Sequence, residues 1–281
     1  MENQMVKKEP RIINYYDGEK DFISTADGDA DILTGLMVDV ETTGLDSRKD
    51  KIIEIGLVSF QFDSLSGKIT EVLKVDNFLQ DPGQPLSAEI VKLTGLTDEI
   101  LKDQSFDMGK IDSHFSNANI IIAHNARFDR GFIHQKFKSS SDKLWACSMD
   151  DVNWRSNGFG CRTLQHLCND CLFYFEGHRA EIDCLATLKL LSNDRGGAIF
   201  LKELFDNAQK KEFFVHAVKA PFASKDMLKA ARFRWDADNK VWYKKVSESE
   251  QKEINELMSK VYPNSPQHVI KELSLSDRFL T

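Results

Sequence analysis

Acidic side chains alternate with valines in MVDVETTGLD, residues 37–46, a run that otherwise has the composition of a buried strand. Successive strand side chains point to opposite faces, so Asp39 and Glu41 project together while Val38 and Val40 point into the core. Two adjacent carboxylates repel each other and one takes up a proton, unless a divalent cation lies between them. A lone Asp-x-Glu pair is more often a solvated strand end, so a metal site requires further acids.

Two further aspartates and a histidine could complete such a site. Asn125 follows an apolar run and can cap the helix that begins with ARFD, which places Asp129 near the positive end of that helix. The alternative role for Asp129 is simple compensation of the helix dipole. His178 lies five residues before Asp183. Five helical residues turn through about 500°, so a loop histidine beside a helical aspartate fits better than two helical residues.

The surrounding sequence predicts the elements that would position these side chains. Three β-rich segments with short connections predict an antiparallel meander: residues 32–40, 51–63 and 68–79. Two short capped helices are expected within 87–101, then a strand, turn and helix over 119–137. A further strand is expected at 143–148 and a helix within 177–194. This order describes a mixed sheet with helices packed on it.

Three separated motifs occur in the order DVETTGL, HNARFD and HRAEID. Together they resemble the DEDDh group of 3′–5′ exonucleases (DnaQ-like), which includes the proofreading subunit of bacterial replicative polymerase, ribonuclease T and oligoribonuclease. The resemblance covers residues 33–195, including KLTGLTDEIL between the first two motifs. It implies an α/β fold of the ribonuclease H-like type, with a mixed five-stranded sheet flanked by helices.

The resemblance also implies a catalytic site. Its metal ligands would be Asp39, Glu41, Asp129 and Asp183, with Asp39 bridging two divalent cations. These would be Mg²⁺ or Mn²⁺, hard ions that suit oxygen ligands. His178 would be the general base that takes a proton from the attacking water. Such a two-metal site would cut the terminal phosphodiester in line and release nucleoside 5′-monophosphates.

Residues expected to bind the substrate flank these motifs: Thr42, Thr43, Gly44, Leu45, Asn125 and Phe128. The first three could bring backbone amides to the terminal nucleotide, and Leu45 resembles the family's apolar wedge against the last base. Phe128 corresponds to an aromatic on which a base can stack, a contact worth about 1–3 kcal/mol. Core packing is the alternative for Leu45 and Phe128, and helix capping alone is the alternative for Asn125.

Composition restricts the class of protein. No apolar run in the 281 residues approaches the roughly 20 that span a bilayer, and the N-terminal MENQMVKKEP lacks the apolar region of a secretory signal. We therefore expect a cytoplasmic protein with no membrane partner. The five cysteines indicate reduced thiols. Cys161, Cys168 and Cys171 have no matching second pair at zinc-finger spacing, so buried thiols are favoured over a zinc site.

Charge and aromatic content predict four segments: a polar leader at 1–31, the exonuclease domain at 32–210, a small basic α+β module at 211–247, and a helix and tail at 248–281. Between Val215 and Ser247, eight basic and three acidic residues give a net charge of +5. Because the whole chain has a net charge of −7, the rest of the chain has a net charge of −12. Aromatic residues interleave with these cations, as in single-strand binding platforms. A module this small also needs some of them for its core, so a structural or protein-docking role stays open.

The function expected from the sequence is metal-dependent 3′–5′ exonucleolysis. The substrate would be a single-stranded nucleic acid with a free 3′ end, with DNA slightly favoured over RNA, and a polymerase or repair protein is the partner considered. One alternative is an exoribonuclease of the oligoribonuclease and ribonuclease T type. The other is a non-catalytic nucleic-acid-binding or polymerase-associated subunit, against which the presence of all five catalytic positions argues. The sequence does not indicate an oligomeric state.

Overall fold

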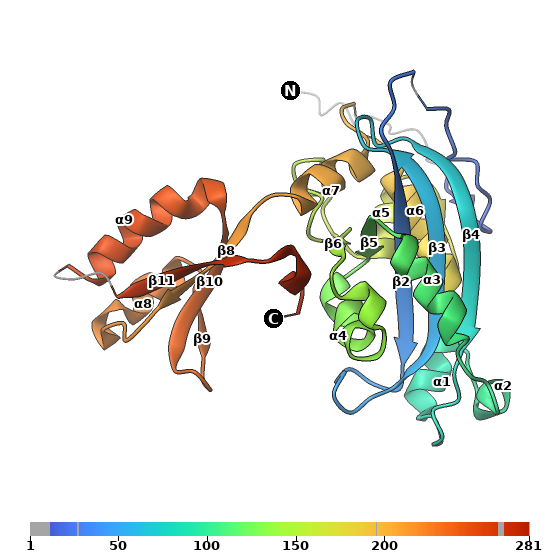
Figure 1. Cartoon of the computed structure of the whole chain (residues 1–281), viewed down its shortest axis with the longest axis horizontal. Coiled ribbons are helices and arrows are strands. Elements are labelled where there is room, and N and C mark those ends of the chain that lie inside the picture. The colour runs from blue at the N-terminus through green and yellow to red at the C-terminus, as the bar shows by residue number, and fades with distance from the viewer. Residues whose placement is uncertain (1–11, 27, 195, 264–266, 281) are drawn as a thin grey trace, which may run out of the picture. The chain divides into compact units, whose positions relative to one another are not determined.

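The computed structural model describes residues 12–26, 28–194, 196–263 and 267–280. The chain divides into two compact units (Figure 1). The first unit comprises residues 1–208 and 279–281, and the second unit comprises residues 209–278. No helix among the described residues is both long and apolar enough to cross a membrane.

The first unit is built on a five-stranded sheet in the order β4-β3-β2-β5-β6. Its strands are β2 (Ile32–Thr42), β3 (Ile52–Asp63), β4 (Ile69–Leu79), β5 (Ile120–Ala123) and β6 (Leu144–Cys147). The first three form an antiparallel meander, while β5 runs parallel to β2 and β6 runs parallel to β5. The predicted meander and mixed sheet are therefore confirmed.

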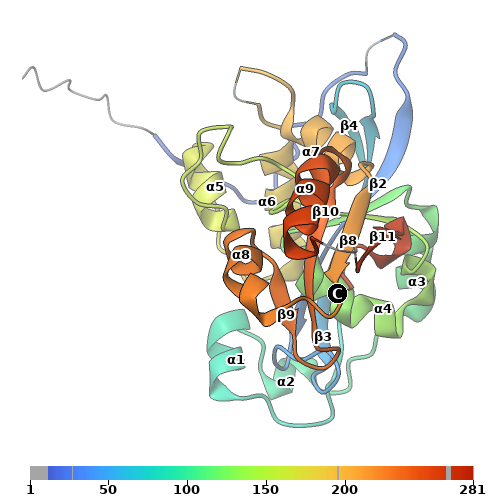
Figure 2. The same ribbon diagram turned by 90° about the vertical axis from the view of Figure 1, so that its left-hand side faces the viewer.

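Helices cover both faces of this sheet (Figure 1). The helices of the first unit are α1 (Ala88–Thr94), α2 (Asp98–Leu101), α3 (Met108–Asn117), α4 (Ala126–Lys136), α5 (Leu164–Asp170), α6 (Ala180–Leu191) and α7 (Phe200–Ala208). The predicted caps of the two short helices are confirmed, since the Ser87 hydroxyl accepts from the Ile90 N–H and the Thr97 hydroxyl from the Ile100 N–H. Figure 2 shows α1 and α2 lying next to each other.

Side chains that alternate along the strands pack into two separate cores, one on each face of the sheet. Val38 and Val40 pack with α3 and α4 on one face, as predicted, together with Phe279, where the chain re-enters the first unit. Met37 and Phe60 pack with α5, α6 and α7 on the other face. Burial of each such side chain stabilises the fold by about 1.5–3 kcal/mol. The Asp39 and Glu41 side chains, in phase with Met37, belong to the α6 face.

The polar leader expected at 1–31 is wrong in part. Residues 1–11 lie outside the described residues, but β1 (Asn14–Tyr15) pairs in parallel with β7 (Phe173–Tyr174). Tyr16 is buried, with its ring edge-on to Phe173 at 5.7 Å between centroids. The aromatic pair gives this segment an apolar surface that the sheet helices can bury, which the polar composition around it concealed.

The second unit is an α+β fold with an antiparallel sheet in the order β11-β8-β10-β9. Its elements are β8 (Glu212–Ala217), α8 (Lys225–Ala230), β9 (Arg234–Asp236), β10 (Val241–Ser247), α9 (Gln251–Val261) and β11 (His268–Leu273). The expected tail at 248–281 is wrong, because β11 pairs with β8 and α9 buries Ile254 and Met258 in the core. The module expected at 211–247 needs both elements because so short a segment buries too little apolar surface alone.

Candidate metal and nucleotide site

Three carboxylates from two elements of the first unit meet at one point. Asp39 and Glu41 project from β2, and Asp183 lies in the first turn of α6. One oxygen of each lies within 4.8 Å of the others, close enough for all three to bind a single metal ion. An all-oxygen, all-anionic donor set of this kind fits a hard divalent cation.

Gly56 on β3 allows α6 to bring Asp183 to this point. It lies directly opposite Asp39 in the β2–β3 register. A Cβ on Gly56 would come within 2.3 Å of the Ala180 carbonyl carbon and 2.5 Å of the Glu181 nitrogen. Both are backbone atoms, which cannot move aside as the end of a flexible side chain could. The absence of a side chain therefore lets the start of α6 rest against the strand.

Asp129 approaches the same strand from the other side. It lies in the first turn of α4 and is buried, and its Oδ1 accepts a hydrogen bond of 3.2 Å from the Val40 N–H, between Asp39 and Glu41. Val40 lies beyond the residues of β2 that pair with β5, so its N–H has no partner on that strand. The Asp129 carboxylate accepts the hydrogen bond in place of a strand carbonyl. All four predicted acids thus converge on the end of β2.

The acids perturb one another strongly. Burial, followed by repulsion from Asp129, Asp183 and Glu41, raises the pKa of Asp39 well above its usual value. Burial likewise raises the pKa of Asp129 well above its usual value. Burial and the neighbouring acids raise the pKa of Glu41 to about 7, and burial raises that of Asp183 to about 6. Full ionisation is therefore disfavoured until a cation compensates the charge.

His178 lies on the loop before α6, as predicted. Its side chain is exposed and its φ of 70° is in the left-handed region, which marks the sharp change of direction into the helix. The Asp183 Oδ2 accepts a hydrogen bond of 3.1 Å from the Arg179 N–H. His178 also lowers the pKa of Asp183, by a backbone hydrogen bond and by the charge of its imidazole. The structure thus places the four acids at the end of β2 and His178 on the loop that leads into α6.

Two residues beside the acids were missed by the sequence reasoning. Glu54 on β3 pairs in register with Glu41 and is fully buried. Its Oε1 accepts hydrogen bonds from Arg179 Nε at 3.0 Å and from Asn77 Nδ2 at 2.7 Å. The signal was a glutamate inside the apolar run IIEIG and an arginine inside HRAEID. The positive charge of Arg179 opposes the rise in the pKa of Glu41, so its guanidinium partly compensates the negative charge at the edge of the acidic cluster.

The end of β2 and the loop after it hold four of the predicted substrate-binding residues. Thr42 is buried and its hydroxyl donates to the Gly44 carbonyl at 2.6 Å, while the Thr43 N–H donates to the Lys51 carbonyl at 2.9 Å. The Thr43 amide therefore does not donate to a nucleotide as expected, because the Lys51 carbonyl just before β3 already accepts its hydrogen bond. A Cβ on Gly44 would lie 2.5 Å from the Asp50 carboxylate. Leu45 is 87% exposed, which excludes core packing.

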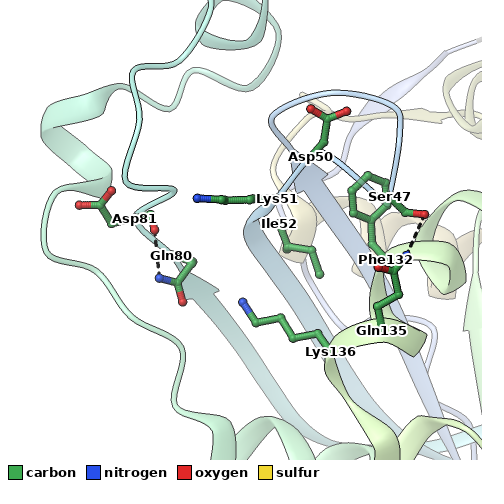
Figure 3. A pocket seen from close by; sticks show the side chains of 9 residues that line it. All are labelled: Ser47, Asp50, Lys51, Ile52, Gln80, Asp81, Phe132, Gln135 and Lys136. Carbon is green, nitrogen blue, oxygen red and sulfur yellow. Dashed lines mark hydrogen bonds between the residues drawn. The ribbon is translucent and has the colours of Figure 1, made fainter.

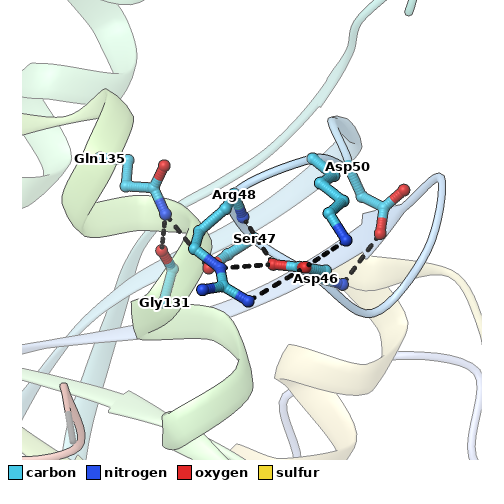
Figure 4. A network of polar contacts seen from close by, with 7 residues as sticks. Asp46, Ser47, Arg48, Asp50, Gly131 and Gln135 are labelled. Atoms are coloured by element: carbon cyan, nitrogen blue, oxygen red, sulfur yellow. Dashed lines mark hydrogen bonds and ion pairs between the residues drawn. The ribbon is translucent and has the colours of Figure 1, made fainter. Parts of the chain in front are cut away.

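Polar contacts hold this loop in one shape (Figure 4). Asp50 Oδ2 accepts from the Asp46 N–H at 2.8 Å, and Asp46 in turn accepts from the Arg48 backbone and guanidinium. Gln135 on α4 donates to the Ser47 hydroxyl at 3.1 Å, which joins the loop to the helix that carries Asp129. Leu45 therefore lies on a loop that these contacts hold in place, residues 43–51, which we call the braced loop.

The other two predicted contacts lie at the start of α4. Asn125 occupies the N-cap position, but its side chain makes no capping hydrogen bond, so the predicted cap is wrong. Its φ of 74° explains the residue type, since asparagine tolerates the left-handed region better than most residues. Phe128 is partly buried against the core, and its ring centroid lies 5.1 Å from that of Phe132.

A separate cavity of about 400 Å³ lies against the braced loop (Figure 3). Its lining residues are Ser47, Asp50, Lys51, Ile52, Gln80, Asp81, Phe132, Gln135 and Lys136. Lys51 and Lys136 extend toward Gln80 and Asp81 at the end of β4, and Lys51 Nζ donates to the Pro82 carbonyl at 2.6 Å. None of the predicted catalytic acids lines this cavity.

The cysteines differ in burial. Cys147, Cys168 and Cys184 are buried, as expected of small apolar groups in strands and helices. Cys161 and Cys171 are partly exposed, so the expectation of buried thiols is wrong for these two.

Comparison with known proteins gives the family. The model of the RNase T family, described as "Exonuclease", matches residues 36–191, more than half of the 281 residues. The chain belongs to this exonuclease family. The match spans all three motifs, and it confirms the resemblance to DnaQ-like 3′–5′ exonucleases and the ribonuclease H-like mixed sheet.

This exonuclease is also similar to parts of two bacterial proteins named DNA polymerase III PolC-type. The protein of Listeria welshimeri is 40% identical over 107 residues, which cover 37% of this chain and 7% of that protein. The protein of Streptococcus agalactiae is 28% identical over 218 residues, which cover 72% of this chain and 13% of that protein. The exonuclease therefore spans only a small part of the length of these relatives.

Two solved structures align with the exonuclease. Exonuclease X in complex with 5′ overhanging duplex DNA is 24% identical with a TM-score of 0.45, covering 62% of this chain and 99% of that chain. E. coli exonuclease I in complex with a dA16 oligonucleotide is 19% identical with a TM-score of 0.45, covering 66% of this chain and 48% of that chain.

Proposed function

We propose that this exonuclease removes nucleoside 5′-monophosphates one at a time from the 3′ end of single-stranded DNA. The observation that carries the proposal is the convergence of Asp39, Glu41 and Asp183 within 4.8 Å, with Asp129 bonded to the strand between the first two. The similarity to proteins named DNA polymerase III supports DNA over RNA as the substrate. It also supports a polymerase or another protein of DNA replication or repair as the partner.

In the proposed mechanism Asp39, Glu41, Asp129 and Asp183 would hold two divalent cations, Mg²⁺ or Mn²⁺. When bound there, such ions supply Lewis acidity that activates water and stabilises the departing 3′ oxygen. His178 stands exposed beside Asp183, where its imidazole can take the proton of the attacking water. The raised pKa values of Glu41 and Asp183 fit ligands that lose protons when a cation binds.

The residues around the acids would position the 3′ nucleotide. Leu45, exposed on the braced loop, would press against the last base, and the partly buried Phe128 would offer a ring edge or face to it. The backbone of Thr42 and Gly44 would line the terminal sugar, and Asn125 would lie near the phosphate at the start of α4. These roles orient the scissile bond for in-line attack.

Incubation of 5′-labelled DNA and RNA oligomers with Mg²⁺, Mn²⁺ or a chelator tests the proposal. We expect a descending series of DNA products that disappears with the chelator and in Asp39→Ala. His178→Ala should retain metal binding by calorimetry while turnover falls by about 10²–10⁴-fold. Internal cleavage would exclude the exonuclease mechanism, and faster degradation of RNA than of DNA would favour an exoribonuclease.

A further inference from the structure

A pocket in the second unit is lined by aromatic and cationic side chains that the proposed catalytic site does not use. Its volume is about 450 Å³. Its lining residues are Ala220, Phe222, Lys225, Lys229, Trp235 and Trp242. Three aromatic rings and two ammonium groups therefore surround one concave space.

Two of the three aromatic side chains of this pocket, Phe222 and Trp235, are not needed by the core of the second unit, whereas Trp242 packs against that core. Phe233 fills that core together with Val215 and Leu228. In contrast, Phe222 is 85% exposed and Trp235 is 49% exposed. Large aromatic rings exposed side by side around a cavity, rather than scattered singly, indicate a surface that binds a partner.

The two tryptophans form one wall. Trp235 on β9 and Trp242 on β10 are directly paired across the sheet, so their side chains share a face. Their ring centroids lie 5.5 Å apart with the planes inclined at 57°. Because the rings are tilted, neither covers the face of the other, and a planar group can lie against the wall.

Helix α8 supplies the cations of the pocket. Lys225 and Lys229 lie one turn apart on α8, so they share a helix face. The Lys225 ammonium lies 5.4 Å from the centroid of the Phe222 ring. Neither lysine has an acidic group within ion-pair distance among the described residues. Two such cations favour an anionic ligand and disfavour the quaternary ammonium groups that purely aromatic cages bind.

We propose that this pocket binds single-stranded DNA, with a base against Phe222 and Trp235 and the adjoining phosphates on Lys225 and Lys229. The second unit has 14 basic and 10 acidic residues and carries +4, whereas the rest of the chain carries −11. The pocket therefore supplies attraction for a polyanion that the acidic first unit lacks. This inference rests on the proposed function, because it assigns to the pocket the strand that the first unit degrades.

The test is fluorescence anisotropy of a labelled oligothymidine of about 20 nucleotides, with the full chain in chelator so that no cleavage occurs. Phe222→Ala combined with Trp235→Ala should weaken binding by about 30-fold, which corresponds to two stacking contacts at the low end of their range. Tyr174→Ala, an exposed aromatic of the first unit, is the matched control and should bind like the wild type. Unchanged affinity of the double variant, with an unchanged melting temperature, would overturn the proposal.

Salt dependence tests the lysines separately. Lys225→Gln with Lys229→Gln should reduce the slope of log affinity against log salt by about 1.4, for two single-strand phosphates. Lys252→Gln with Lys260→Gln removes the same charge from α9, outside the pocket, and should change the slope less. Equal changes of the salt slope in both lysine pairs would show that only general electrostatics acts, and would overturn the pocket assignment. Binding of an acidic aromatic peptide to the pocket, when the oligonucleotide does not bind, would overturn it as well.

The two proposals fail in different ways. A wild-type chain that degrades DNA in Mg²⁺, while the Phe222 and Trp235 variant binds as well as the wild type, overturns the pocket alone. A chain that binds DNA through the pocket but does not shorten it in Mg²⁺ or Mn²⁺ overturns the proposed function alone.

Discussion

Gly56 on β3 and Ala180 at the start of α6 are in direct backbone contact, since a Cβ on Gly56 would lie 2.3 Å from the Ala180 carbonyl carbon. Gly56 is also the register partner of Asp39. The contact therefore fixes how closely the helix that carries Asp183 approaches the strand that carries Asp39.

Gly56→Ala should separate that helix from the strand. Overpacking of this kind costs about 1–3 kcal/mol of stability, and a displacement of Asp183 by about 1 Å should lower kcat by roughly 100-fold. Thermal unfolding and initial rates on labelled DNA measure both effects. Gly160→Ala, at a position with no atom within 4 Å of the added Cβ, is the control. A Gly56→Ala enzyme with wild-type stability and rate would show that the contact does not position α6.

The acidic cluster should make the metal-free protein less stable as pH rises. Burial and neighbouring acids raise the pKa of Glu41 from 4.5 to about 7, so its stabilising contribution is fully present below pH 4.5 and is lost as pH rises through 7. The difference in melting temperature between wild type and Glu41→Gln in chelator isolates this effect from the other carboxylates. We expect Glu41→Gln to be relatively more stable at pH 7.5 than at pH 4.5. A constant difference would contradict the raised pKa.

Asp39→Asn should change the melting temperature in opposite directions, relative to wild type, without and with metal. Removing one charge from the cluster relieves repulsion, so the melting temperature in chelator at pH 7.5 should rise by about 2–4 °C for each kcal/mol recovered. The same variant should lose the stabilisation that wild type gains from Mn²⁺, because one of the proposed metal ligands is gone. Differential scanning calorimetry with and without Mn²⁺ measures both. Equal Mn²⁺ stabilisation of variant and wild type would place the ion elsewhere.

The Arg179–Glu54 ion pair should stabilise the loop that carries His178. Arg179→Met leaves the Glu54 carboxylate buried beside Glu41 without its cation, and because Arg179 is half-exposed we expect a loss of about 1–3 kcal/mol. Adding Glu54→Gln should recover most of that loss, since a neutral amide needs no counter-charge. Denaturant unfolding of the single and double variants measures the coupling, with the exposed Arg155→Met as control. Additive effects would exclude an interaction between the two side chains.

Leu45 should affect turnover without affecting the fold. It is exposed on a braced loop, so Leu45→Ala should leave the melting temperature unchanged. Loss of about 1–2 kcal/mol of apolar contact with the last base should lower kcat/KM on single-stranded DNA by about 5–30-fold. Leu65→Ala, an exposed leucine in the turn between β3 and β4, is the matched control. Equal kinetics of the two variants would remove the wedge role from Leu45.

The sequence predicted what depends on local periodicity. Alternation along residues 37–41 placed Asp39 and Glu41 on one face, and the order of strands and helices gave the mixed sheet. Glu54 was missed because its pairing with Glu41 depends on strand register, which a run of apolar residues does not specify. The last strand, β11, was missed because its partner β8 lies more than 50 residues earlier in the chain.

The position of Phe279 determines how the second unit can be removed. The chain leaves the first unit after Ala208 and returns to bury Phe279 in the core beside α3 and α4. The second unit is therefore covalently joined to the bulk of the first unit only through the connection after Ala208, and after a protease cut there only the noncovalent packing of Phe279 would hold it. A deletion that is meant to isolate catalysis has to excise residues 209–278 and rejoin the ends, because a simple stop after Ala208 would also take an aromatic ring out of the catalytic core.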